Sequence, residues 1–201
     1  MTTLLQQTKN QEPVAFGGFS ELYIINDKAV KVMEDTCYTD VLEETLRQRI
    51  AADAGLAPQV YSVTELPEDT VIIVMDRVPE GYENLETFEE GVPTLLHELS
   101  SYDQIKGLAL YCQMLKAGIL HADFHTGNWF LNKETGETLA IDFGLASELK
   151  DATKKHLKRA IQFILAPVAL IDENVADDLL FAFEGDEEEM REALLAAAEL
   201  F

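Results

Sequence analysis

Two short polar motifs, separated by a predicted hairpin, constrain the fold of this chain more than any other feature. The first, HADFHTGN, runs from His121 to Asn128 and matches the pattern H-x-D-x-x-x-x-N; the second, Asp-Phe-Gly, begins at Asp142, 14 residues after Asn128. Between them, residues 129–141 read as an apolar strand, a turn and a second strand. A hairpin of this length returns Asp142 to the loop that holds the first motif.

The polar side chains of these motifs suit phosphoryl transfer. A phosphoryl group that leaves a nucleotide carries negative charge on its oxygens, so its site needs divalent cations on oxygen ligands and a group that orients the attacking hydroxyl. Asp123 would accept or orient the hydroxyl proton, while Asn128 and Asp142 would bind the metal. ATP and Mg²⁺ are therefore the expected cofactors. The alternative is an acidic surface hairpin with an incidental histidine.

A nucleotide site of this kind also needs a lysine on an upstream strand. Residues 29–33 supply an apolar strand with Lys31 at its centre, preceded by the turn-forming pair Asn26-Asp27. Lys31 would bind the α and β phosphates. Before it, residues 15–23 can be laid on the nucleotide-covering pattern G-x-G-x-x-G-x-V, with only Gly17 in register and Gly18 beside it. The two glycines would let backbone amides approach phosphate, although an ordinary turn has the same composition.

Lys31 further requires a carboxylate partner on the following helix. Residues 40–53 are predicted to form that helix, because three aliphatic residues recur at four-residue intervals. These are Leu42, Leu46 and Ile50. Glu43 borders this apolar stripe and Glu44 points nearly opposite, so helical phase favours Glu43. In the alternative interpretation, Glu43 and Arg47 form a surface ion pair.

The apolar run that begins at Val71 breaks into polar and turn residues at residues 76–81. At a nucleotide site, backbone groups near Asp76 and Val78 would bond adenine, with Met75 behind the base. A buried strand with an ordinary exit is the simpler interpretation of this segment.

Together these residues resemble the protein-kinase-like superfamily over roughly residues 14–165. Lys31, Asp123, Asn128 and Asp142 match the family's nucleotide, base and metal positions. The run 119–128 is most similar to minimal members: kinases secreted by bacterial pathogens as effectors, phage kinases, and the aminoglycoside and choline phosphotransferases with H-G-D-x-H-x-G-N loops.

The resemblance implies an α+β, bilobal fold. A disordered lead at residues 1–12 would precede a small β-rich N-lobe at 13–80 and a truncated, helical C-lobe at 81–201. The nucleotide would bind between the lobes.

Two positions depart from regulated protein kinases. Ala122 replaces the arginine that reads a phosphate on the activation loop, and no A-P-E sequence follows Asp142, so activation by loop phosphorylation is not expected. His125 stands where serine/threonine kinases usually carry a lysine that contacts the transferring group. It is a candidate catalytic residue, or a histidine that caps local backbone, and it leaves the acceptor open.

The net charge of the chain limits the kinds of molecule that it can bind. Fifteen basic against 37 acidic residues give a net charge of −22, which opposes binding to nucleic acid and accommodates a basic protein substrate more easily. No apolar run reaches the roughly 20 residues of a membrane span. Cys37 and Cys112 lack metal spacing, so reduced thiols in a cytoplasmic setting are expected, in the producing cell or in a host.

The charges also separate along the chain. Residues 172–201 are predicted to form two acidic amphipathic helices around Gly185-Asp186, either as a solvated outer face or as a docking surface. Five bases lie within residues 150–159: Lys150, Lys154, Lys155, Lys158 and Arg159. They would bind an acidic partner or a phosphate, or offset the acidic helices within the fold.

The sequence thus predicts a minimal serine/threonine protein kinase, as a monomer or bound to a partner, without an activation-loop switch. A small-molecule phosphotransferase and a kinase-like binding module are the alternatives.

Overall fold

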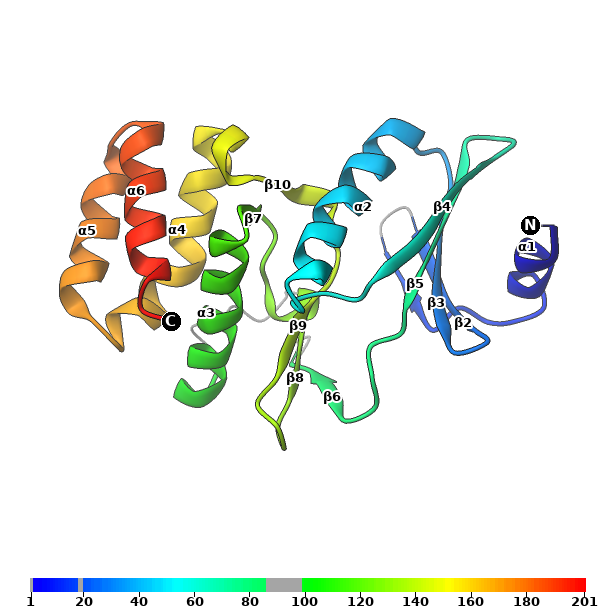
Figure 1. Cartoon of the computed structure of the whole chain (residues 1–201), viewed down its shortest axis with the longest axis horizontal. Helices are drawn as coiled ribbons and strands as arrows, with labels where there is room; N and C mark the ends of the chain where they lie inside the picture. The colour runs from blue at the N-terminus through cyan, green and yellow to red at the C-terminus, as the bar shows by residue number, and fades with distance from the viewer. Residues whose placement is uncertain (1, 18–19, 86–98) are drawn as a thin grey trace.

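A five-stranded antiparallel sheet forms the N-terminal part of the chain (Figure 1). The computed structural model describes residues 2–17, 20–85 and 99–201. The strands lie in the order β1-β2-β3-β5-β4. Their bounds are Ala15–Phe16 (β1), Ser20–Ile25 (β2), Lys28–Met33 (β3), Val60–Leu66 (β4) and Thr70–Asp76 (β5). Asn26 and Asp27, both with positive φ, close the β2-β3 hairpin, which confirms the predicted turn.

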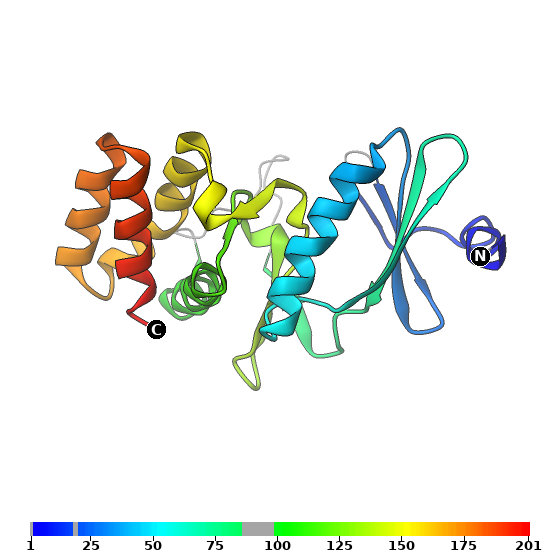
Figure 2. The ribbon, with the colours of Figure 1, turned by 45° about the horizontal axis from the view of Figure 1, so that its top comes forward.

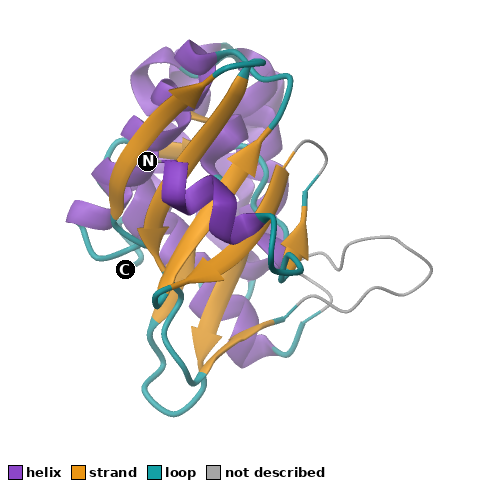
Figure 3. Ribbon diagram, turned by 90° about the vertical axis from the view of Figure 1, so that its right-hand side faces the viewer, coloured by secondary structure: helices purple, strands orange, loops and turns teal. Residues whose placement is uncertain are grey.

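Each face of this sheet packs against a different helix. On one face, Val41 of α2 (Tyr38–Asp53) packs with Ile73 and other strand residues. On the other, Leu4 of α1 (Thr2–Thr8) lies against the cluster that contains Tyr23, and Figure 3 shows α1 crossing this outer face. Residues 1–12 were predicted to be a disordered lead, whereas the structure has α1 at Thr2–Thr8. Packing of the partly buried Leu4 on the sheet stabilises a helix too short to form alone.

The C-terminal part is mostly helical, with two small sheets on its surface toward the N-terminal sheet (Figure 1). The strands β6 (Tyr82–Asn84), β8 (Trp129–Asn132) and β9 (Thr138–Ala140) form one sheet, and β7 (Ile119–His121) pairs with β10 (Ala146–Glu148). The helices are α3 (Ser101–Lys116), α4 (Lys154–Ala169), α5 (Glu173–Glu184) and α6 (Glu187–Ala198). The predicted hairpin that returns Asp142 to the loop of residues 121–128 is confirmed by the β8-β9 pairing.

The α+β, two-lobed architecture predicted for the kinase-like fold is observed. The chain leaves the large sheet at Asp76 and enters the C-terminal lobe through β6, so residues 77–81 connect the lobes. Helix α2 contacts β7 and β10 as well as the sheet, and Figure 2 shows it lying between the two lobes. Because α2 touches both lobes, its polar side chains can reach the candidate site.

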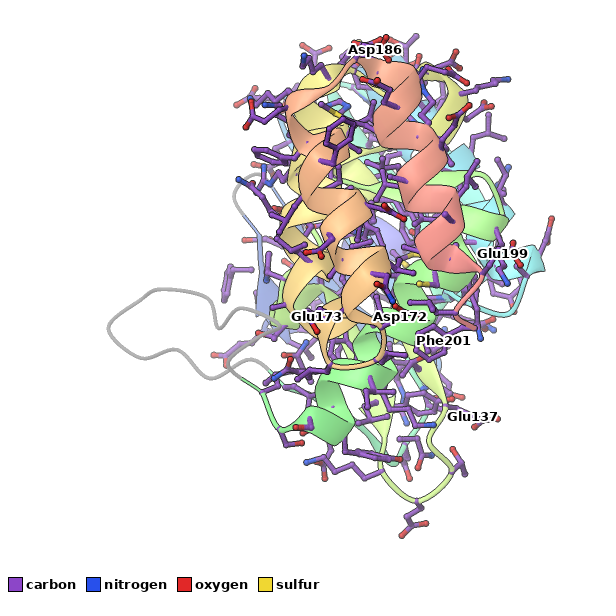
Figure 4. All side chains as sticks on the ribbon, turned by 90° about the vertical axis from the view of Figure 1, so that its left-hand side faces the viewer. Glu137, Asp172, Glu173, Asp186, Glu199 and Phe201 are labelled. Atoms are coloured by element: carbon purple, nitrogen blue, oxygen red, sulfur yellow. The ribbon has the colours of Figure 1, made fainter. Side chains whose placement is uncertain are left out.

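The predicted acidic helices at the C-terminus are confirmed as α5 and α6, which lie side by side as the outermost layer in Figure 4. Asp186 caps α6 in a capping box with Glu189. Helix α3 also has a polar cap, which the hydroxyl of Ser100 provides by accepting from the amide of Asp103. No helix in the described part of the chain is long and apolar enough to cross a bilayer.

Candidate active site

Lys31 forms ion pairs with carboxylates from both lobes. Its ammonium Nζ donates to Glu44 Oε1 at 2.8 Å and to Asp142 Oδ1 at 3.4 Å. The lysine comes from β3, the glutamate from α2 and the aspartate from the turn after β9. Lys31 and Glu44 are largely buried, with side chains 14% and 8% exposed, whereas Asp142 is 52% exposed. The buried pair therefore anchors a carboxylate that is itself half-exposed.

The partner of Lys31 is Glu44, so the prediction of Glu43 was wrong. Glu43 is exposed and binds Arg47 at 2.6 Å, as in the surface-pair interpretation. The helical phase misled because the buried face of α2 is largely polar. It comprises Val41, Glu44, Thr45, Gln48 and Ala51, whereas Leu42 and Leu46 are exposed. Gln48 can be buried because its amide donates to Pro58 O and is thereby satisfied.

The electrostatics favour an ionised carboxylate at Asp142. Burial alone would raise the pKa of Asp142, but the charge and hydrogen bond of Lys31 outweigh burial and hold this pKa below its ordinary value. For Lys31, burial acts to lower the pKa, and Asp142 and Glu44 together raise it. Both groups are therefore charged at neutral pH, as phosphate and metal binding require.

The paired glutamates of α2 provide a matched test. Glu44→Gln removes the buried charge next to Lys31 and is expected to raise the KM for ATP about tenfold, equivalent to ~1.4 kcal/mol. Glu43→Gln breaks only an exposed pair, which contributes at most about 1 kcal/mol to stability, and should leave KM unchanged. Steady-state kinetics on both variants check the assignment. Equal KM values for the two would contradict the role given to Glu44.

The buried side chain of His121 forms hydrogen bonds to the backbone of both motif segments. Its ring is fully buried; Nδ1 accepts from the amide of Asp123 at 3.3 Å, and Nε2 therefore carries the proton that it donates to Ile141 O at 3.0 Å. The amide of Ile141 in turn donates to Asn128 O at 2.9 Å. These bonds fix the loop of residues 121–128 to Ile141, the residue immediately before Asp142.

This arrangement predicts a pH-dependent stability. Burial lowers the pKa of His121 below 6.5, and the bond to Ile141 O only partly offsets that effect. Below pH 6.5 the unfolded chain binds a proton here that the folded protein does not, so stability is lost as the pH falls, by up to about 1.4 kcal/mol per pH unit. Urea unfolding of the wild type and His121→Gln at several pH values should give a steeper acid loss for the wild type. Parallel pH profiles would contradict the neutral, buried histidine.

Asn128 and Asp142 form a donor set that fits a magnesium ion. The Asn128 amide donates from Nδ2 to Asp123 O at 2.8 Å, which leaves its carbonyl oxygen Oδ1 as the atom that can face a cation. Among the described residues, no group of three or more His, Cys, Asp or Glu side chains could hold a metal. Mg²⁺ needs no such group, because it commonly keeps water and nucleotide phosphate oxygens beside one or two protein ligands.

Of the two interpretations of His125, the backbone cap is observed, and the catalytic role stays a prediction. Its Nδ1 accepts from the amide of Gly127 at 3.1 Å and so caps the turn of residues 126–128. Its Nε2 lies 3.9 Å from Asp123 Oδ2. The ring is thus held by local backbone with its other nitrogen facing the proposed base.

Arg159 also lies in the site, although the sequence did not identify it as a site residue. A guanidinium nitrogen of this α4 residue donates to Asp123 Oδ1 at 2.7 Å. The only sequence signal was its place in the basic cluster of residues 150–159, which gave no indication of a contact across 36 positions.

The structure describes three of the four other residues predicted to bind nucleotide: Gly17, Asp76 and Val78. Gly17 follows β1 and its amide donates to Ser20 O, while Gly18 lies outside the described residues. The amide of Asp76 donates to Gln59 O, and its carboxylate binds Lys28 and Tyr61. Asp76 therefore cannot offer its N–H to adenine, which leaves Val78 in the 77–81 connection as the candidate amide donor.

The comparison with protein families agrees with this geometry. A family model described as the ABC1 atypical kinase-like domain matches residues 97–173, less than half of the chain. The matched stretch contains Asp123, Asn128, Asp142 and Arg159. No curated protein matches the chain. The family match supports a place in the protein-kinase-like superfamily and, at that level, kinase-like phosphotransferase chemistry with ATP and Mg²⁺.

Proposed function

We propose that this chain is an ATP- and Mg²⁺-dependent kinase that phosphorylates serine or threonine hydroxyls of proteins. The observation that carries the proposal is the contact of Lys31 with both Glu44 and Asp142, next to a loop that presents Asp123. A charged lysine, a half-exposed carboxylate and a separate base are the groups that phosphoryl transfer requires.

Each residue has a distinct role in this proposal. Lys31 binds the α and β phosphates, while Asn128 and Asp142 hold Mg²⁺, which when bound neutralises charge on the phosphate oxygens. Asp123 orients the acceptor hydroxyl and takes its proton. Glu44 keeps Lys31 extended toward the nucleotide.

The segment after Asp142 supports an enzyme that needs no loop phosphorylation. Residues 146–148 form β10 and pair directly with β7, with Ala146 opposite His121. Ala122, at the position of the phosphate-reading arginine, is buried and apolar. The short segment is thus already fixed against the catalytic loop, which favours a constitutively organised site.

Transfer of labelled γ-phosphate tests the proposal. The purified chain would be incubated with labelled ATP, Mg²⁺ and either basic or acidic protein acceptors, and the labelled amino acid identified after hydrolysis. We expect phosphoserine or phosphothreonine, with basic acceptors preferred because of the net charge of −22. Equal labelling by the wild type and Asp123→Asn would refute the proposal.

Phosphorylation of a small molecule is the second candidate, and the position of His125 beside Asp123 favours it. The pattern H-x-D-x-H-x-G-N resembles the aminoglycoside and choline phosphotransferases. Stimulation of ATP turnover by an aminoglycoside, choline or a sugar, without protein labelling, would favour this candidate over the first.

A further inference from the structure

Arg159 lies on α4, a helix to which the proposed mechanism gives no other role, and its side chain contacts Asp123. The guanidinium binds Oδ1 of Asp123 at 2.7 Å, and the side chains are 42% and 27% exposed, respectively. The pair is therefore partly accessible and incompletely screened by solvent. Arg159 also lies over the ring of Phe163, 5.8 Å from its centroid, which helps to hold its side chain in place.

Neighbouring bases of the basic cluster have other partners. Lys154 Nζ donates to Gly185 O at 2.8 Å, and Lys158 Nζ lies 4.0 Å from Glu184. These two lysines bind the acidic C-terminal helices, as one of the sequence interpretations expected. Arg159, by contrast, turns to the catalytic loop.

We propose that Arg159 is a positioning residue that holds the carboxylate of Asp123 in place for the transfer step. This inference rests on the proposed kinase function. Two backbone bonds already fix Asp123, namely its amide to His121 Nδ1 and its carbonyl to Asn128 Nδ2. Arg159 fixes the carboxylate by binding Oδ1, so that Oδ2, 3.9 Å from His125 Nε2, is the oxygen that would take the acceptor proton.

The chemical step shows why this matters. The acceptor oxygen forms a bond to the γ-phosphorus, the bond from that phosphorus to the bridging oxygen of ADP breaks, and its electron pair leaves with ADP. The hydroxyl proton passes to Asp123 Oδ2. An arginine stays charged throughout, so it keeps the carboxylate of Asp123 in one orientation until the proton is transferred.

Three variants test the inference: Arg159→Ala, Arg159→Lys and the control Lys155→Ala. Lys155 lies one turn earlier on α4, is exposed, and forms no ion pair within the described part of the chain. Arg159→Ala should lower kcat about 10- to 100-fold, because a misplaced catalytic group costs that much, with the KM for ATP unchanged. Arg159→Lys should recover part of the loss, and Lys155→Ala should behave as wild type.

Chemical rescue separates positioning from folding. Guanidinium at concentrations well below those that unfold the protein should restore part of the kcat of Arg159→Ala and none of that of Asp123→Asn. An Arg159→Ala variant with wild-type kcat would overturn the inference. A loss of kcat in Arg159→Ala that comes with a lower melting temperature, is not restored by guanidinium and is not recovered in Arg159→Lys would also overturn it. No transfer by the wild type would instead overturn the proposed function, and the inference with it.

Discussion

Replacing Asp142 with asparagine is expected to lower kcat by roughly 10³-fold or more while the protein remains folded. The half-exposed carboxylate of Asp142 is the anionic ligand proposed for Mg²⁺ and is also bound by Lys31. Asparagine keeps the shape of the side chain and removes its charge, so the metal loses its strongest protein ligand where charge develops. Transfer rates measured across a range of Mg²⁺ concentrations check this expectation.

Asparagine is the appropriate replacement because of the backbone at this position. Asp142 has φ 57° and ψ 76°, a left-handed conformation that aspartate and asparagine tolerate better than alanine. Asp142→Ala would add roughly 1 kcal/mol of backbone strain to the loss of charge. The control for net charge is Glu43→Gln on α2, which likewise removes one acidic charge and should retain activity. Wild-type transfer by Asp142→Asn at low Mg²⁺ would contradict the metal assignment.

Replacing Asp123 with asparagine is expected to lower kcat by about 10²- to 10⁴-fold without weakening ATP binding. Asparagine preserves the backbone bonds to His121 and Asn128, but it cannot take the hydroxyl proton and loses the charge bound by Arg159. The nucleotide is held by other residues in the proposal, chiefly Lys31. The variant should therefore separate binding from chemistry.

Single-turnover transfer together with a nucleotide-binding titration measures that separation. Asp151→Asn, an exposed aspartate that precedes α4, serves as the control with one charge removed. A variant Asp123→Asn with full transfer rate, or with lost ATP affinity and an unchanged rate, would contradict the role of Asp123.

Local patterns predicted most of the secondary structure around the site. The strand that carries Lys31 and the turn at Asn26-Asp27 depend on neighbouring residues, whose alternation and turn chemistry are visible in the sequence. The β8-β9 hairpin that returns Asp142 was predictable for the same reason. Such elements lie where the local preference and the tertiary packing agree.

The errors arose where tertiary packing decides. Helix α2 does not bury an apolar stripe, because Leu42 and Leu46 are exposed and Gln48 is buried. A prediction based on such a stripe therefore favoured Glu43 over Glu44. The contact of Arg159 with Asp123 joins side chains 36 residues apart and follows no short-range pattern. The candidate site thus combines predictable strands and loops with side-chain pairings that only the three-dimensional arrangement determines.

Anomalous diffraction from crystals grown with Mn²⁺ and a non-hydrolysable ATP analogue tests the central claim most directly, because it locates metal and nucleotide together. The account predicts a manganese peak roughly 2.0–2.3 Å from a carboxylate oxygen of Asp142 and from Asn128 Oδ1, with Lys31 Nζ bound to the α or β phosphate. A nucleotide bound elsewhere, or a metal that contacts neither Asn128 nor Asp142, would contradict it.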